Sequence, residues 1–113
     1  MQLSVTGRHI QITDPMRRYA EEKASKLQRF YDRIESIDVI LEQESSKFRV
    51  EVVVRADHRN TFVGQVGADD FYESIDLVVD KLERQLKKHK EKHRNRKHST
   101  KSIVPPEEGE SPD

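Results

Sequence analysis

The chain has 113 residues, of which 33% are apolar and 37% charged, so its length and composition allow one domain with a small core. It has no cysteine, no long apolar run and no signal-peptide pattern at its N-terminus, which excludes a disulfide framework and a membrane span and leads us to expect a cytoplasmic protein. Its net charge is zero, but the charge is unevenly distributed along the sequence.

The first strand and the first helix are marked by alternation and by a helix start. Residues 2–8 (QLSVTGR) alternate polar and apolar side chains, which predicts a strand. Thr13, Asp14 and Pro15 combine a capping side chain with a proline near the first helical position. One apolar stripe marks the helix that follows: Met16, Tyr19, Ala20, Ala24, Leu27, Phe30, Tyr31 and Ile34.

Lys23 falls inside that apolar stripe, between Tyr19 and Leu27. One interpretation is a lysine that lays its aliphatic stem along the core and lifts its amine into water. The other is a functional lysine, because a lysine costs more free energy on a core-facing position than a leucine does. The residues alone leave both interpretations open.

Three further strands follow the first helix. Residues 36–43 are rich in Ile, Val and Leu, while residues 47–56 and 61–68 alternate apolar and polar side chains. Because the connections 44–46 and 57–60 are short, we expect an antiparallel meander. The alternation predicts one buried face and one face in water.

The second helix begins at Asp69 and Asp70, whose carboxylates suit the positive end of a helix dipole. Beyond Leu86 its apolar stripe stops, so we expect the helix to pack only to about that residue and its basic end to project or fray. The predicted core stripe is Tyr72, Ile75, Val79, Leu82 and Leu86.

The order β-α-β-β-β-α predicts an α+β fold: a two-layer sandwich with a four-stranded sheet and two helices on one face. The crossover through the first helix predicts that the first two strands are parallel if they are neighbours. Residues 1–98 are expected to form the domain, and residues 99–113 a disordered acidic tail.

Positive charge is concentrated at the end of the second helix. Residues 81–101 carry 10 basic and 2 acidic side chains, a net charge of +8, whereas residues 1–80 and 102–113 each have a net charge of −4. A helix dipole favours each C-terminal cation by about 0.3–1 kcal/mol, which accounts for two or three of them. It does not account for the rest, because like charges four residues apart repel. The block therefore predicts a polyanionic partner.

RNA phosphate is the polyanion that these residues favour. Lys81, Arg84 and Lys88 form one narrow stripe nearly opposite the predicted core, at about 100° per residue. No apolar stripe continues there, which argues against a membrane anchor. Lysine predominates over the side chains that read DNA base edges, and an α+β sandwich with a basic helix is similar to readers of double-stranded RNA. The positive field is extended by Lys87, Lys90, Lys92, Arg94, Arg96 and Lys97.

Neither a metal site nor an active site is predicted. His89 and His93 are one helical turn apart and His98 follows, but no cysteine or carboxylate cluster accompanies them, and lysines would repel a metal cation. The sequence has no cysteine nucleophile, GxSxG, P-loop or GxGxxG motif. We therefore expect no metal, cofactor, small-molecule substrate or enzyme activity.

Several spaced segments resemble one family. SVTGRHIQIT, ITDPMRRYAEEKASKLQRFYDRI, DDFYESID and DKLERQLKKHKEK are similar to the ribosome hibernation promoting factors, also called ribosome-associated inhibitor A or protein Y. The resemblance covers about residues 1–95. It implies the same β-α-β-β-β-α fold, and a cytoplasmic protein of stress or stationary phase.

The resemblance also implies a partner. Members of the family bind the 30S ribosomal subunit between head and body, contact mainly 16S rRNA phosphates, and occlude mRNA and the A- and P-site tRNAs without catalysing a reaction. By position in the motifs, the implied rRNA-binding residues are Lys23, Lys26, Lys81, Arg84 and Lys88. The surface is continued by Lys87, Lys90 and Lys92, while the residues interpreted as structural are Tyr72, Ile75 and Asp76.

Two features depart from the family's pattern. Long members add a C-terminal domain that joins two ribosomes, and this chain lacks it. The chain therefore resembles either a short form or a truncated long form. A short form acts on single ribosomes or beside a separate ribosome-dimerising factor. Arg18 and the loop 57–60 match no motif and are assigned no role. A general double-stranded RNA-binding module and a protein-interaction regulator of transcription are the alternative functions.

Overall fold

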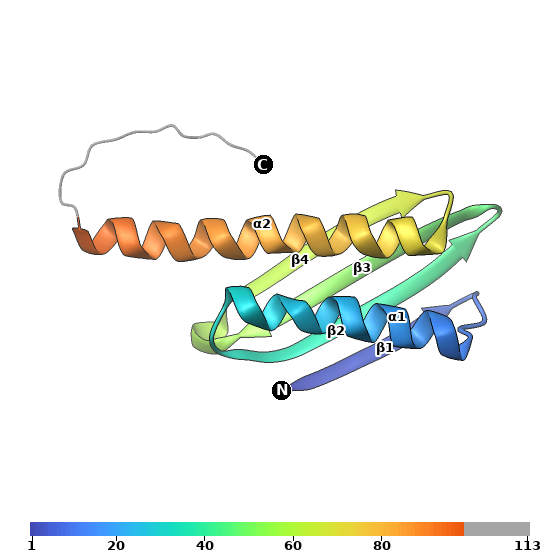
Figure 1. Ribbon diagram of the computed structural model, residues 1–113, viewed down its shortest axis with the longest axis horizontal. Helices are drawn as coiled ribbons and strands as arrows, with labels where there is room; N and C mark the ends of the chain where they lie inside the picture. The colour runs from blue at the N-terminus through green and yellow to red at the C-terminus, as the bar shows by residue number, and fades with distance from the viewer. Residues whose placement is uncertain (99–113) are drawn as a thin grey trace.

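The computed structural model describes residues 1–98, with the side chains of residues 1–90 (Figure 1). The elements are, in chain order, β1 (Gln2–Arg8), α1 (Asp14–Ser25), η1 (Lys26–Phe30), β2 (Ile34–Glu44), β3 (Lys47–Ala56), η2 (Asp57–Arg59), β4 (Thr61–Ala68) and α2 (Phe71–His98), where η1 and η2 are 3₁₀ turns. The strands form one sheet in the order β1-β2-β3-β4. The predicted α+β order is confirmed.

The register of the sheet places its small apolar residues in rows under the helices. Val5 of β1 pairs with Val39 of the parallel strand β2, Val39 pairs with Val52 of the antiparallel strand β3, and Val52 pairs with Gly64 of β4. The predicted parallel pair is therefore confirmed. A Cβ on Gly64 would lie 3.2 Å from Leu82 Cγ, so the missing side chain lets α2 approach β4 closely.

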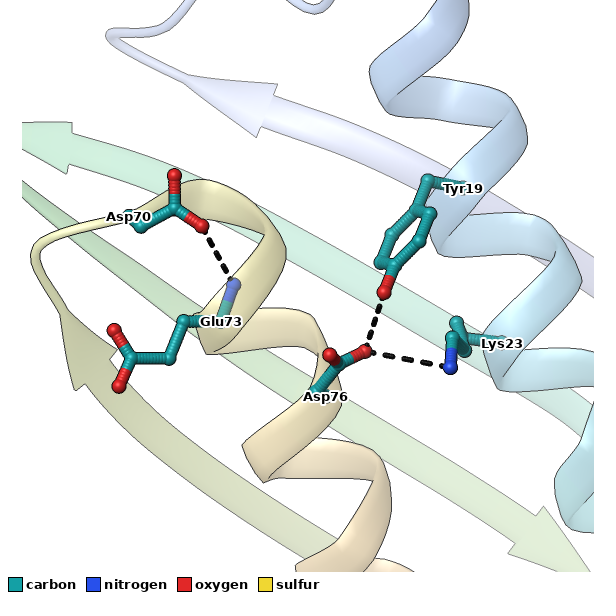
Figure 2. A network of polar contacts seen from close by, with 5 residues as sticks. All are labelled: Tyr19, Lys23, Asp70, Glu73 and Asp76. Atoms are coloured by element: carbon teal, nitrogen blue, oxygen red, sulfur yellow. Dashed lines mark hydrogen bonds and ion pairs between the residues drawn. The ribbon is translucent and has the colours of Figure 1, made fainter.

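Both helices lie on the same face of the sheet, with α1 over β1 and β2 and α2 over β3 and β4 (Figure 1). As predicted, Thr13 caps α1: its hydroxyl accepts a hydrogen bond from the Met16 amide at 3.2 Å. Asp70 caps α2 in the same way, since its carboxylate accepts from the Glu73 amide at 3.0 Å (Figure 2). The second helix thus begins one residue after its predicted acidic start.

The first helix is shorter than its apolar stripe predicted. It ends at Ser25, and the prediction was wrong for Ile34, which is the first residue of β2 and is buried there. Tyr31 already has an extended backbone, with φ −157° and ψ 127°. Its hydroxyl donates to Asp57 at 3.2 Å and accepts from Asn60 at 3.0 Å, so it ties the end of η1 to the β3–β4 connection.

The core stripe of α2 is rotated from the predicted one. Tyr72 is 42% exposed, so its prediction as a core residue was wrong, and Phe71 is buried in its place. The reason is an edge-on contact between the Phe71 and Phe48 rings, whose centroids are 6.3 Å apart. The observed stripe is Phe71, Ile75, Val78, Val79, Leu82 and Leu86.

Packing of α2 also reaches further than predicted. The half-buried His89 ring lies 5.3 Å from the Phe62 ring and 5.7 Å from the Tyr31 ring, centroid to centroid, so contact does not stop at Leu86. The helix continues to His98 and projects past the end of the sheet (Figure 1). The tail predicted for residues 99–113 lies outside the described residues. Among the described helices, none is long and apolar enough to cross a membrane.

Candidate nucleic-acid interface

A groove between η1 and α2 gathers the cations of the first helical segment. Lys23 comes from the last turn of α1, and Lys26, predicted inside the first helix, is the first residue of η1. Arg29 lines the same groove and was missed by the sequence analysis, although its spacing of three residues from Lys26 could have indicated it. The α2 side of the groove is acidic, and the full lining is Lys23, Lys26, Arg29, Phe30, Asp76, Val79, Asp80 and Glu83.

Lys23 is held by an ion pair across the two helices. Its Nζ lies 3.5 Å from Asp76 Oδ1 and 5.5 Å from the centroid of the Tyr19 ring. The Tyr19 hydroxyl donates to the same Asp76 oxygen at 2.6 Å, so both side chains of α1 point at one carboxylate of α2 (Figure 2). Lys23 therefore does more than cover the core with its stem.

The hydrogen bond to Asp76 also changes the acidity of Tyr19. Together with burial and the negative charge of Asp76, it raises the pKa of Tyr19 to about 12. The cause is that loss of the phenolic proton would break the bond and place a second negative charge beside the carboxylate.

The cations of α2 point in different directions. Lys81 Nζ donates to the Gln65 carbonyl of β4 at 3.0 Å, which turns it toward the edge of the sheet. Lys87 lies on the opposite flank, 3.0 Å from Glu83 and 5.1 Å from the centroid of the Phe30 ring of η1. Arg84 lies between these flanks and is exposed. The predicted stripe of Lys81, Arg84 and Lys88 is thus on one helix, but Lys81 lies at its margin.

Four cations of the interface have no hydrogen bond or ion pair within the described residues, and all four are exposed. They are Lys26 and Arg29 of η1 and Arg84 and Lys90 of α2. Lys88 is also exposed but has an interaction within the protein. The Lys92 side chain lies outside the described part of the chain. The four open cations are the groups best placed to meet an external anion.

The face of the sheet opposite the helices has mixed charge. Asp38 accepts from the Ser4 hydroxyl at 2.7 Å and from the Arg55 guanidinium at 2.6 Å, and Arg49 lies 3.5 Å from Glu44. Opposite charges pair on that face, so it offers no uniform positive field. Among the described residues, no group of three or more His, Cys, Asp or Glu side chains could hold a metal ion.

The chain is an α+β sandwich whose open cations lie on the helical layer. Residues 3–94 match the family described as Sigma 54 modulation protein / S30EA ribosomal protein, and the chain belongs to this family.

Two curated relatives carry the name ribosome hibernation promoting factor. The ribosome hibernation promoting factor of Azotobacter vinelandii is 42% identical over 92 residues, which is 81% of this chain and 85% of that protein. The factor of the same name from Escherichia coli K12 is 35% identical over 92 residues, covering 81% of this chain and 96% of the relative.

Solved structures agree with the family assignment. A ribosomal subunit interface protein from Coxiella burnetii superposes with a TM-score of 0.74 at 32% identity, over 80% of this chain and 99% of the other. The N-terminal domain of Thermus thermophilus Protein Y gives a TM-score of 0.69 at 33% identity, over 76% of this chain and 94% of the other. The fold expected from the family resemblance is therefore confirmed.

Proposed function

We propose that this protein is a ribosome hibernation factor that binds 16S rRNA in the decoding channel of the 30S subunit, blocks mRNA and A- and P-site tRNA, and so silences translation in stress or stationary phase. The names of the relatives and of the similar structures support a ribosomal partner. The action is occlusion, which needs no catalysed reaction, no cofactor and no small-molecule substrate.

The observation that carries the proposal is the set of open cations on the helical layer. Lys26, Arg29, Arg84 and Lys90 are exposed and have no ion pair within the described residues, so they do not have to leave an intramolecular partner to bind a phosphate. Charge-assisted contacts to phosphate supply a large share of the affinity of proteins for nucleic acids. The sandwich fixes the backbones of η1 and α2 relative to one another, so the four cations extend from one rigid surface.

The test is co-sedimentation with purified 30S and 50S subunits, with and without an excess of RNA duplex, together with inhibition of a cell-free translation reaction. We expect retention on 30S subunits that duplex RNA does not compete away, and loss of inhibition when initiator tRNA and mRNA are bound first. Equal binding to duplex RNA and 30S subunits would support a general double-stranded RNA-binding module instead. Binding that does not respond to salt would support a protein partner, as the words "Sigma 54 modulation" in the family description suggest.

A further inference from the structure

The two walls of the η1–α2 groove carry opposite charges. Its lining combines Lys23, Lys26 and Arg29 of α1 and η1 with Asp76, Asp80 and Glu83 of α2, and Phe30 and Val79 also line it. Glu83 is paired with Lys87, but a phosphate that entered the groove beside Lys23 would be repelled by Asp76 and Asp80, so this part of the groove is a poor phosphate site. The open cations at its rim are Lys26 and Arg29, and Lys23 lies deeper, beside Asp76.

Asp76 already neutralises Lys23 in the free protein. The Lys23 side chain is 32% exposed and that of Asp76 49% exposed, so water and ions reach the pair. A third side chain, Tyr19, nevertheless fixes the position of the carboxylate. The Tyr19 hydroxyl, at 2.6 Å from Asp76 Oδ1, holds the carboxylate toward α1 (Figure 2). A phosphate that approaches Lys23 must therefore displace this carboxylate or lie beside it and be repelled.

We propose that Asp76 is a specificity-determining residue that withholds Lys23 from RNA in general, so that Lys23 contacts phosphate only on a target that Lys26 and Arg29 already bind. This inference rests on the proposed function and adds discrimination to it. A duplex that reaches Lys23 without also contacting Lys26 and Arg29 gains one phosphate contact, and this gain is offset by the lost pair with Asp76. A folded rRNA target that already contacts Lys26 and Arg29 gains free energy from several contacts at once. This gain offsets the loss of the pair between Lys23 and Asp76.

Asp76→Asn removes the charge that holds Lys23 but keeps an oxygen that can accept from Tyr19. We expect duplex RNA to bind up to about fivefold more tightly, which is the range that one exposed ion pair contributes. The slope of log K against log salt should steepen by about 0.7–0.9, as for one added phosphate contact. Binding to 30S subunits should change less than twofold, so the preference for 30S should fall.

Asp80→Asn is the matched control, because Asp80 lies on the same wall of the groove and has no ion pair within the described residues. It changes the net charge equally, and we expect less than a twofold gain for duplex RNA. An equal gain in both variants would show that long-range charge alone is at work and would overturn the proposal. Weaker duplex binding by Asp76→Asn would overturn it too, since Asp76 would then position Lys23 for RNA.

A double-mutant cycle with Lys23→Met isolates the pair. In the Lys23→Met background, Asp76→Asn should give no larger gain in duplex affinity than Asp80→Asn does, because no lysine is left to release and only the change in net charge remains. A gain of about fivefold that persists there would contradict the role given to Lys23. Thermal unfolding of each variant verifies that it is folded, and Asp76→Ser is a second charge-removing variant if the asparagine is not tolerated. The cycle is measured on duplex RNA, so it tests the coupling of Asp76 and Lys23 separately from the preference of the wild-type protein for 30S subunits. Absence of that preference would contradict the proposed function, whereas absence of coupling would contradict the role of Asp76.

Discussion

Lys81 and Gln65 are joined by a hydrogen bond in which the lysine Nζ donates to the backbone carbonyl at 3.0 Å. One turn later, Gln85 Nε2 donates to the Val63 carbonyl at 2.9 Å. Both carbonyls belong to β4, which is an edge strand and would otherwise offer them to another chain. On the other edge, Arg17 donates to the Val5 carbonyl of β1 at 2.9 Å. Side chains of the two helices therefore occupy backbone carbonyls on both edges of the sheet.

Lys81→Met should destabilise the fold, while Arg84→Met should not. The first variant removes the bond to Gln65 and keeps the length of the side chain, so we expect a loss of about 0.5–1 kcal/mol in the free energy of unfolding. The second removes an exposed cation with no partner within the described residues and should stay within about 0.5 kcal/mol of wild type. Urea denaturation measures both. Equal effects would mean that the Lys81 bond does not contribute to stability.

Reversing charge at two of the open cations should weaken binding to 30S subunits without unfolding the protein. We expect Arg84→Glu with Lys90→Glu to weaken binding by roughly tenfold or more near 0.1 M salt, because two attractive contacts become repulsive. Arg8→Glu, on the face of the sheet opposite the helices, is the control for each single reversal, Arg84→Glu or Lys90→Glu, because it changes the net charge equally. Filter binding or sedimentation measures the affinity, and an equal loss in the control would show that only net charge matters.

Arg29 should contribute to the same surface, although the sequence analysis did not include it. Arg29→Gln is expected to reduce the salt slope of 30S binding by about 0.7–0.9, the amount that one phosphate contact contributes. The matched control is Arg18→Gln, because Arg18 is an exposed arginine of α1 that does not line the groove. If both variants kept the wild-type slope, Arg29 would not be part of the interface.

Tyr19 should lose its phenolic proton only at high pH, and its titration can be followed by the absorbance of tyrosinate. We expect a pKa near 12, against 10.0 for an unperturbed tyrosine. Because the folded-state pKa lies above the unfolded one, the stabilisation from the Asp76 bond is complete below about pH 10 and is lost as the pH rises toward 12. Asp76→Asn should lower the pKa. A titration that is unchanged in that variant would argue against the bond.

The packing of α2 on the sheet depends on Leu82 much more than on Leu77. Leu82 is fully buried beside Gly64, and Leu82→Ala should cost about 2–5 kcal/mol of unfolding free energy through lost burial and a residual cavity. Leu77 is on the same helix but is 43% exposed, so Leu77→Ala should cost less than about 1 kcal/mol. Thermal and urea unfolding would have to rank the variants in this order.

The fold could be predicted because each element has a clear local signal. Alternation along residues 47–56 and 61–68 marked two strands, and the Thr13 cap marked α1. Errors arose where tertiary contacts select between neighbouring positions. Phe71 rather than Tyr72 enters the core because its ring meets Phe48, which is distant in sequence.

The candidate site could be predicted only as a set of cations. The basic block identified Lys81 and Lys87 and the family resemblance identified Lys23, but no local pattern shows that Asp76 is the partner of Lys23 or that the Gln65 carbonyl is the partner of Lys81. Only the pair of Glu83 and Lys87, four residues apart on one helix, could have been predicted from spacing. Two of these three contacts join elements far apart in the chain, so they depend on the register of the sheet and on the way the helices pack. The same holds for the aromatic contacts of His89.

The projection of α2 beyond the sheet gives the molecule a large electric dipole. Residues 1–80 have a net charge of −4, while nine basic and two acidic residues lie between positions 81 and 98. The positive end is therefore the far end of a helix that extends past an acidic body (Figure 1). In the field of a polyanion, such a dipole rotates the molecule helix-first before any contact forms, over distances set by the Debye length of about 10 Å at 0.1 M salt. With the polyanionic partner proposed above, orientation during diffusion would precede recognition, and ionic strength would control the rate of association.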